Sequence, residues 1–218
     1  MKRKLKLLAM TGLLAAAMMV TAACGVEFDA SGYVKSFMDM VCKGEIKEYT
    51  KFTGMSEEEA KKEYEEFTDS MMDPLKEAGM SEDVQKRFRD VYIKLFAKSK
   101  YTVKEAKKTG DDEFTVDVEI EPIQGIYDGL SEELEQETTN HVQEMMNNGE
   151  ELDQTVLTEW VFNTMLDKIE ARMGSITYGD PVTVTCKVIK DGKNYKIEDE
   201  EKFGEEVGRN LIDQSGMQ

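Results

Sequence analysis

Histidine and cysteine are scarce in this 218-residue chain, which has one histidine and three cysteines. A single histidine, His141, excludes any mechanism that needs two. No pair of cysteines has the C-x-x-C spacing that is typical of zinc and redox sites. No Gly-x-Ser-x-Gly sequence marks a nucleophilic serine, and Gly110 and Gly125 stand alone rather than in a glycine-rich phosphate loop. The sequence therefore offers no recognisable catalytic set, and we expect no cofactor.

Positive charge is also in short supply, with 28 Lys and Arg residues against 45 Asp and Glu residues. Four of the basic residues and none of the acidic ones lie in residues 1–23, which leaves 24 basic and 45 acidic residues and a net charge of −21. A chain this acidic repels nucleic acid and an anionic membrane surface. We therefore expect no nucleic-acid partner.

The first 24 residues have the three parts of an export signal. Basic residues from Lys2 to Lys6 are followed by 17 uncharged residues through Ala23, too few for the roughly 20 that span a bilayer. The ending Thr21-Ala22-Ala23-Cys24 resembles the lipobox of bacterial lipoproteins, a small-residue triplet followed by cysteine. This resemblance implies a diacylglyceryl group on the Cys24 sulfur and cleavage before Cys24. An uncleaved anchor and an ordinary signal that happens to contain cysteine are the alternatives.

The resemblance implies a layout of three parts: a signal peptide (1–23), a lipidated cysteine with a short tether (24–30) and a single α+β domain (31–214). The protein would be held by its lipid at the extracytoplasmic face of the cell membrane. Five extended residues from Gly25 to Asp29 reach at most about 18 Å, so the domain should lie close to the bilayer. Cys42 and Cys186 are then too few for a disulfide scaffold. We expect both thiols to be buried and leave open whether they pair.

Helical spacing dominates the first third of the domain. Apolar residues from Tyr33 to Val41 lie on one stripe, and Gly44 is a suitable stop. Ser56 and Glu59 predict a capping box at the start of a second helix. Pro74 should kink or restart that helix because proline lacks an amide hydrogen. Ser81 is expected to cap a third.

Alternating apolar residues then predict two hairpins separated by a pair of helices. The first hairpin contains Tyr101–Val103 and Phe114–Ile120, and the second contains Val182–Val188 and Tyr195–Ile197 around an Asp-Gly turn. Helical spacing covers residues 130–145, 152–173 and, more weakly, 203–211. The predicted class is α+β, with an antiparallel sheet of about four strands and helices packed on one of its faces.

The order of elements, together with the segment Val41-Cys42-Lys43-Gly44-Glu45, resembles uncharacterised lipoprotein domains with a cystatin-like, nuclear-transport-factor-2-like fold. The resemblance extends over roughly residues 29–198. It implies that the first helix lies in the concave face of a curved sheet, and that the fold contains a cone-shaped cavity. It implies no catalytic residues.

His141 and the acidic clusters are the candidates for chemistry. Glu137 and Glu144 are the helical neighbours able to orient His141 as a base, whereas the alternative is a partly buried helix histidine. The acidic runs at 57–59, 111–113 and 198–201 are candidates for a calcium site. However, calcium needs six to eight converging oxygens, and Lys193 occupies the third position of the best loop, which begins at Asp191. We therefore predict no metal site.

A basic segment runs from Val84 to Gly110 and contains nine basic residues against two acidic ones, a charge of +7. One interpretation is a face for anionic headgroups, with weak and salt-dependent membrane binding. The other is that these residues only balance acidic neighbours. The candidate contact residues are Lys94, Lys98, Lys104, Lys107 and Lys108.

Two functions are compatible with these observations. The first is a non-enzymatic domain that binds an envelope protein or a small ligand. The second is a small enzyme that uses a cone-shaped cavity, with His141 or a buried carboxylate as its base. A closed pocket holding an acid with a raised pKa would favour the enzyme. A cavity filled by Trp160, Phe162 and methionine side chains would favour the binding domain.

Overall fold

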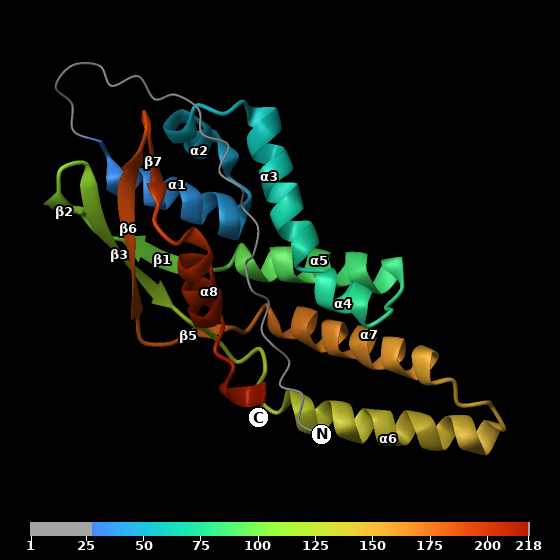
Figure 1. Ribbon diagram of the computed structural model, residues 1–218. Coiled ribbons are helices and arrows are strands. Elements are labelled where there is room, and N and C mark those ends of the chain that lie inside the picture. The colour runs from blue at the N-terminus through green and yellow to red at the C-terminus, as the bar shows by residue number, and fades with distance from the viewer. Residues whose placement is uncertain (1–27, 218) are drawn as a thin grey trace.

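The computed structural model describes residues 28–217, in which helices are packed against an antiparallel sheet (Figure 1). This arrangement confirms the predicted α+β class. The helices are α1 (Ala30–Lys43), α2 (Ile46–Thr53), α3 (Glu57–Ser70), α4 (Asp73–Glu77), α5 (Glu82–Phe96), α6 (Leu130–Asn148), α7 (Gln154–Arg172), α8 (Glu200–Leu211) and the 3-10 helix η1 (Ser215–Met217). The strands are β1 (Lys100–Val103), β2 (Lys107–Gly110), β3 (Glu113–Glu121), β4 (Ile123–Gln124), β5 (Thr177–Tyr178), β6 (Val182–Asp191) and β7 (Asn194–Ile197).

The main sheet has five strands but is four strands wide. Its order is β1-β3-β6-β7, and β2 also pairs with β3. Because β1 pairs with residues 118–121 of β3 and β2 pairs with residues 113–115, these two short strands lie end to end along one edge. The other edge of β3 pairs with β6 over residues 113–120. The short strands β4 and β5 form a separate pair.

The period-two pattern of β3 and β6 separates a buried face from a polar one. Phe114, Val116, Val118 and Ile120 are all buried, while the residues between them are half-exposed. The helices α1 and α8 cover this buried face, since α1 contacts β1 and β3 while α8 contacts β3, β6 and β7. The predicted packing of helices on one face of the sheet is therefore confirmed.

The first helix begins and ends at the residues that its sequence indicates. Asp29 caps it by accepting a hydrogen bond from the Gly32 amide at 2.8 Å. Gly44 ends it with φ of 70°, a conformation that costs glycine little because it has no Cβ. The Val34 and Phe37 side chains between these ends are buried because α1 packs against the sheet.

A buried carboxylate ties α1 to the sheet. Asp39 is only 6% exposed and accepts hydrogen bonds from Tyr101 of β1 at 2.5 Å, from Lys43 at 3.0 Å and from Lys35. Burial alone would raise the pKa of Asp39, but these hydrogen bonds outweigh it and lower the pKa. The carboxylate therefore stays charged and paired inside the fold.

The helix α3 begins at the capping box that the sequence predicts. The Ser56 hydroxyl accepts from the Glu59 amide at 3.2 Å, and the Glu59 carboxylate accepts from the Ser56 amide at 2.8 Å. The helix ends at Ser70, and Pro74 lies in the first turn of α4, which confirms the predicted restart. Ser81 occupies the N-cap of α5 as expected, but its side chain makes no capping hydrogen bond.

Two features of the chain were missed by the sequence pattern. One is α2, in which Ile46, Tyr49 and Phe52 recur every three residues and pack in or against the core, but whose eight residues are too few for this stripe to stand out. The other is the pairing of β4 with β5, two residues each, which is too short for a period to show. The sequence pattern also did not indicate β2, which lies between the two predicted strands of the first hairpin.

The two cysteines of the described region are buried and unpaired. Cys42 is 2% exposed in α1 and Cys186 is 4% exposed in β6, and both are free thiols. Burial raises the pKa of each thiol to about 12, so little thiolate is present at neutral pH. The predicted burial is confirmed, and the thiols do not form a disulfide.

The predicted signal peptide, Cys24 and most of the predicted tether lie outside the described residues. Within residues 28–217, no helix is both long enough and apolar enough to cross a membrane.

Candidate functional site

The helices α6 and α7 form an antiparallel pair that projects from one end of the molecule (Figure 1). We call residues 130–172 the arm. Gly149, with φ of 71°, ends α6, and Asp153 starts α7 by accepting from the amides of Thr155 and Val156 at 2.8 and 3.1 Å. The loop between them is the outermost part of the arm. The predicted pair at 130–145 and 152–173 is confirmed, and each helix is 19 residues long.

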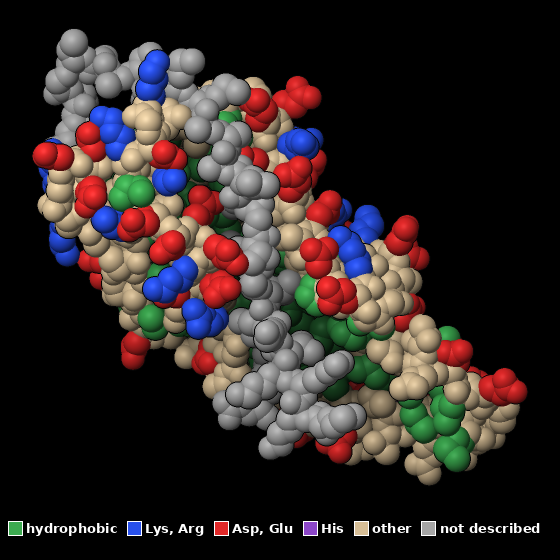
Figure 2. Space-filling view, in the orientation of Figure 1, with side chains coloured by type: hydrophobic (Ala, Val, Ile, Leu, Met, Phe, Trp, Pro, Cys, Tyr) green, Lys and Arg blue, Asp and Glu red, His purple; other side chains and the backbone are tan. Residues whose placement is uncertain are grey.

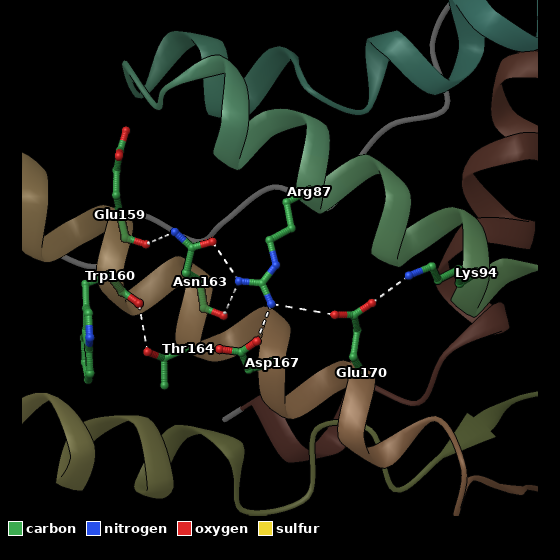
Figure 3. A network of polar contacts seen from close by, with 8 residues as sticks. All are labelled: Arg87, Lys94, Glu159, Trp160, Asn163, Thr164, Asp167 and Glu170. Carbon is green, nitrogen blue, oxygen red and sulfur yellow. Dashed lines mark hydrogen bonds and ion pairs between the residues drawn. The ribbon is translucent and has the colours of Figure 1, made fainter.

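A cluster around Arg87 attaches the arm to α5 (Figure 3). The Arg87 guanidinium donates to the Asn163 side chain at 2.9 Å and to the Asn163 carbonyl at 3.3 Å, and it also binds Asp167. Glu170 lies 3.6 Å from Arg87 and accepts from Lys94 at 2.8 Å, which bridges two turns of α5. Because the guanidinium is a rigid planar fork, these contacts fix the angle of α7 against α5 as well as its distance.

The far end of α7 is attached to α5 by a different contact. The Ser81 amide at the start of α5 donates to the Glu159 carboxylate at 2.8 Å. In a capping box the N-cap amide donates to a glutamate at the third helical position, and because α5 has Val84 there, Glu159 of α7 takes that role. The two residues are 78 positions apart in the sequence, so no local pattern predicts their contact.

A second set of ion pairs attaches α6 to α7. Lys168 lies 2.7 Å from Glu137 and 3.1 Å from Glu133, and Arg172 lies 2.8 Å from Glu133. A hydrogen bond from Lys168 lowers the pKa of Glu133, and the Glu137 and Glu133 carboxylates raise the pKa of Lys168. Arg172 also donates to the Ile126 carbonyl at 2.8 Å. The base of the arm is therefore fixed on both helices.

His141 packs within the arm against an aromatic ring. Its ring stacks on Trp160 with centroids 4.0 Å apart and planes 8° from parallel. Glu137, one of its expected orienting partners, binds Lys168. Among the described residues, no hydrogen bond to the His141 ring is found. The predicted partly buried helix histidine agrees with this placement, and the Trp160 ring serves as a packing surface for α6.

The tip of the arm exposes apolar side chains to solvent. Met146 at the end of α6 is 65% exposed, Leu152 in the loop 50% and Val156 in the first turn of α7 60%. We call these three residues the apolar tip. Figure 2 shows hydrophobic side chains gathered at this end of the molecule, with acidic side chains beside them. Isolated exposed apolar residues are common, but three in one hairpin end are typical of a contact surface.

The arm contains no basic residue over a long stretch. From Leu130 to Asp167 there is no Lys or Arg. Ten acidic residues lie in the same stretch: Glu132, Glu133, Glu135, Glu137, Glu144, Glu150, Glu151, Asp153, Glu159 and Asp167. In α3, by contrast, Lys61 and Lys62 pair with Glu65 and Glu66 four residues on. The outer part of the arm therefore carries negative charge and no positive charge. The absence of Lys and Arg is visible in the sequence, but it was not recognised there as the mark of a surface.

Two partly buried carboxyls form a separate candidate site between α3 and α8. Burial raises the pKa of Glu63 to about 7, with smaller effects from the Glu66 and Glu59 charges. Burial also raises the pKa of Glu200 to about 7, and the Glu63 charge adds to it. One Glu63 oxygen is buried without a hydrogen-bond partner in the described part of the chain. These carboxyls also raise the pKa values of Tyr33 and Tyr49 beyond what burial alone does.

The stability of the protein is expected to fall as the pH rises from about 5 to about 8. Folded Glu63 and Glu200 have pKa values above the ordinary 4.5, so their protonated forms stabilise the fold and this contribution is lost as pH rises through about 7. Glu200→Gln should flatten that decline by about 2 kcal/mol, measured by urea unfolding across the pH range. Glu201→Gln, which removes an exposed neighbour, is the control. An unchanged slope in Glu200→Gln would contradict the assignment.

The lysines of the basic segment are mostly paired with acids. Lys94 binds Glu170, Lys104 lies 2.5 Å from Glu119, and Lys107 lies 3.1 Å from Asp117. Lys108 has a partner as well. This pairing agrees with the interpretation that the segment balances its acidic neighbours. Membrane contact through these lysines stays a prediction.

The acidic runs have structural roles where the structure describes them. Glu59 completes the capping box, and Asp112 accepts from Lys190 at 2.7 Å and from Tyr195 at 2.8 Å. Across residues 28–217 there is no group of three or more His, Cys, Asp or Glu side chains arranged to hold a metal ion.

Comparison with known proteins identifies a similar fold. No family model matches this chain, and no curated protein matches it. Its structure is similar to the crystal structure of a putative lipoprotein, ycdA, from Bacillus subtilis subsp. subtilis str. 168, with a TM-score of 0.60 and 15% sequence identity. The match covers 85% of this chain, which spans 56% of the length of that one. At this identity the likeness establishes a shared fold.

Proposed function

We propose that this protein is a lipid-anchored, extracytoplasmic bacterial lipoprotein that binds another molecule at the cell envelope through its arm, without catalysing a reaction. The observation that carries the proposal is the exposed apolar tip at the end of a firmly attached arm. The proposed layout is a signal peptide (1–23), a lipidated Cys24 with a tether (24–30) and a single domain (31–214). The fold shared with ycdA and the lipobox-like ending at Cys24 support the anchor.

The position of Phe28 gives the anchored protein an orientation. Its ring stacks on Tyr195 of β7 at a centroid distance of 3.9 Å and lies 6.3 Å from that of Phe114 in β3. Cys24 precedes Phe28 by four residues, which reach at most about 14 Å. The lipid would therefore attach near this end of the sheet. Figure 1 shows β2 at this end and the loop of the arm at the opposite one, so the arm would point away from the bilayer.

Two of the candidate lysines also lie at the proposed membrane end. Lys107 and Lys108 are in β2, where Lys108 pairs in register with Phe114. We propose that they face anionic headgroups, at about 1 kcal/mol each before screening. Lys94 is a weaker candidate because it lies at the base of the arm, where it binds Glu170, and not at the proposed membrane end. The lysines would then adjust the orientation, while the lipid provides the attachment.

A fixed, outward-pointing apolar tip suits binding. Interfaces typically have an apolar core surrounded by a polar rim, and the apolar tip with its acidic neighbours has this arrangement. Because the Arg87 and Lys168 contacts already hold the arm in place, a partner would not have to order it first. Preorganisation of this kind lowers the entropic cost of binding.

A photo-crosslinking side chain at Leu152 is expected to capture a neighbour in living cells. The same group at Val182, which is 39% exposed in β6 at a distance from the arm, is the matched control because both sites are exposed and apolar. Leu152 should give a mass-shifted band on irradiation and Val182 should not. Equal bands from the two positions, or none from Leu152, would contradict binding through the arm.

A second candidate function rests on Glu63 and Glu200. A carboxyl whose pKa is near 7 is suited to act as a general base, so a small enzyme with one of these residues as its base is the alternative. The stacking of His141 on Trp160 makes His141 a weaker choice. The pH dependence of the Glu200→Gln variant tests whether the carboxyl titrates where this function requires.

A further inference from the structure

The charge of the arm restricts what its apolar tip can bind. Around the tip, Glu144, Glu150, Glu151 and Asp153 are all exposed, and none of them has a Lys or Arg partner within the described part of the chain. The cations nearest in sequence, Lys168 and Arg172, are held at the base of the arm by Glu133 and Glu137. Among residues 28–217, no ion pair therefore neutralises the acidic charge at the tip.

An anionic bilayer and a second copy of the arm are both poor occupants. Unscreened carboxylates are repelled by anionic headgroups, and like charges brought together across an interface cost several kcal/mol. Two arms meeting tip to tip would bring these acids together. An occupant that carries positive charge around an apolar face has the opposite properties, because it neutralises the acids while it covers Met146, Leu152 and Val156.

We propose that the apolar tip and its surrounding carboxylates bind a basic polypeptide segment that presents apolar side chains on one face. The proposal rests on the proposed function, because it requires the arm to point away from the membrane. The end of a two-helix hairpin is too narrow to enclose a small ligand, but its three apolar side chains can cover one face of a partner helix or strand. The acids would accelerate association, and the apolar contacts would slow dissociation.

The test uses the mature lipidated protein in phosphatidylcholine nanodiscs and a labelled helical peptide. The peptide has about 15 residues, with leucines on one face and lysines on the rest. Binding is followed by fluorescence anisotropy, with empty nanodiscs as background. We expect saturable binding that weakens as salt rises, since screening shortens the range of the carboxylates. Peptides with Ser in place of Leu, or Glu in place of Lys, should not bind.

Two variants separate the apolar and electrostatic parts. Changing Met146, Leu152 and Val156 to Ser should weaken binding at least about tenfold, whereas Val182→Ser should not change it. Changing Glu144, Glu150 and Glu151 to Gln should reduce the salt dependence. The control removes the same charge from three exposed acids on other helices, Glu57, Glu58 and Glu77, and should leave it unchanged.

The outcomes distinguish this proposal from the proposed function. If Leu152 captures a neighbour in cells but the Lys-Leu peptide does not bind, the proposed partner chemistry is wrong and the binding function remains. An adduct with the mass of two copies, or an adduct with lipid, would likewise overturn the basic partner. If neither experiment gives a signal, both the partner and the function are overturned.

Discussion

Cys24→Ser protein is expected to carry no lipid and to keep its signal peptide, so that it remains a 218-residue chain. Serine offers no thiol for the diacylglyceryl group, and lipoprotein-type cleavage follows that modification. Two acyl chains give stable anchoring because each buried CH₂ contributes about 0.8 kcal/mol, whereas a processed chain without them would have only screened lysine contacts. The wild-type protein should therefore sediment with membranes as a 195-residue chain, the length left when residues 1–23 of 218 are removed.

Cys186→Ala is the matched control for this experiment. It also removes one thiol, but that thiol is buried in β6 and is far in sequence from the lipobox-like ending. This variant should stay in the membrane fraction. Recovery of the Cys24→Ser protein with membranes as a processed 195-residue chain would contradict the anchor assignment. Washing with high salt distinguishes residual lysine contacts, which screening removes, from lipid.

Local features of the fold could be predicted from the sequence because their partners lie within a few residues. The capping box of Ser56 and Glu59, the stop at Gly44 and the alternation along β3 were all predicted and are present. Helix caps and strand faces depend on neighbours up to four positions away, so their sequence signals are direct. The α2 helix was missed because its stripe of Ile46, Tyr49 and Phe52 extends over only eight residues.

The candidate sites could not be predicted, because each is assembled from distant segments. Arg87 meets Asn163 across 76 residues, and Glu63 and Glu200 come together from α3 and α8. Glu63 stands three residues after Ala60 and four before Phe67, so helical spacing places it on the buried face of α3, but the sequence does not show that Glu200 lies nearby. The arm differs in this respect, because the absence of Lys and Arg from residues 130–167 can be read directly from the sequence. The sequence did not predict that this stretch lies in a projecting helical hairpin.

The Arg87→Ala variant is expected to loosen the arm without unfolding the sheet. Hydrogen bonds to charged groups contribute about 1.5–3 kcal/mol, and Arg87 is part-buried with a side chain 32% exposed. We expect the free energy of opening α7 to fall by about 2 kcal/mol, which is roughly a thirtyfold loss of hydrogen-exchange protection for amides of Gln154–Arg172. Amides of β3 and β6 should keep their protection, because the sheet does not depend on this cluster.

Arg89→Ala separates the role of Arg87 from a general effect of removing an arginine from α5. Arg89 lies two residues further along, its side chain is 33% exposed, and it binds Asp69 on α3 at 2.6 Å instead of the arm. This variant should leave exchange in α7 unchanged. Arg87→Lys should restore only part of the protection, since an ammonium cannot reproduce the planar fork that contacts Asn163 and Asp167 together. Equal protection of α7 in Arg87→Ala and Arg89→Ala would show that the Arg87 contacts do not hold the arm on α5.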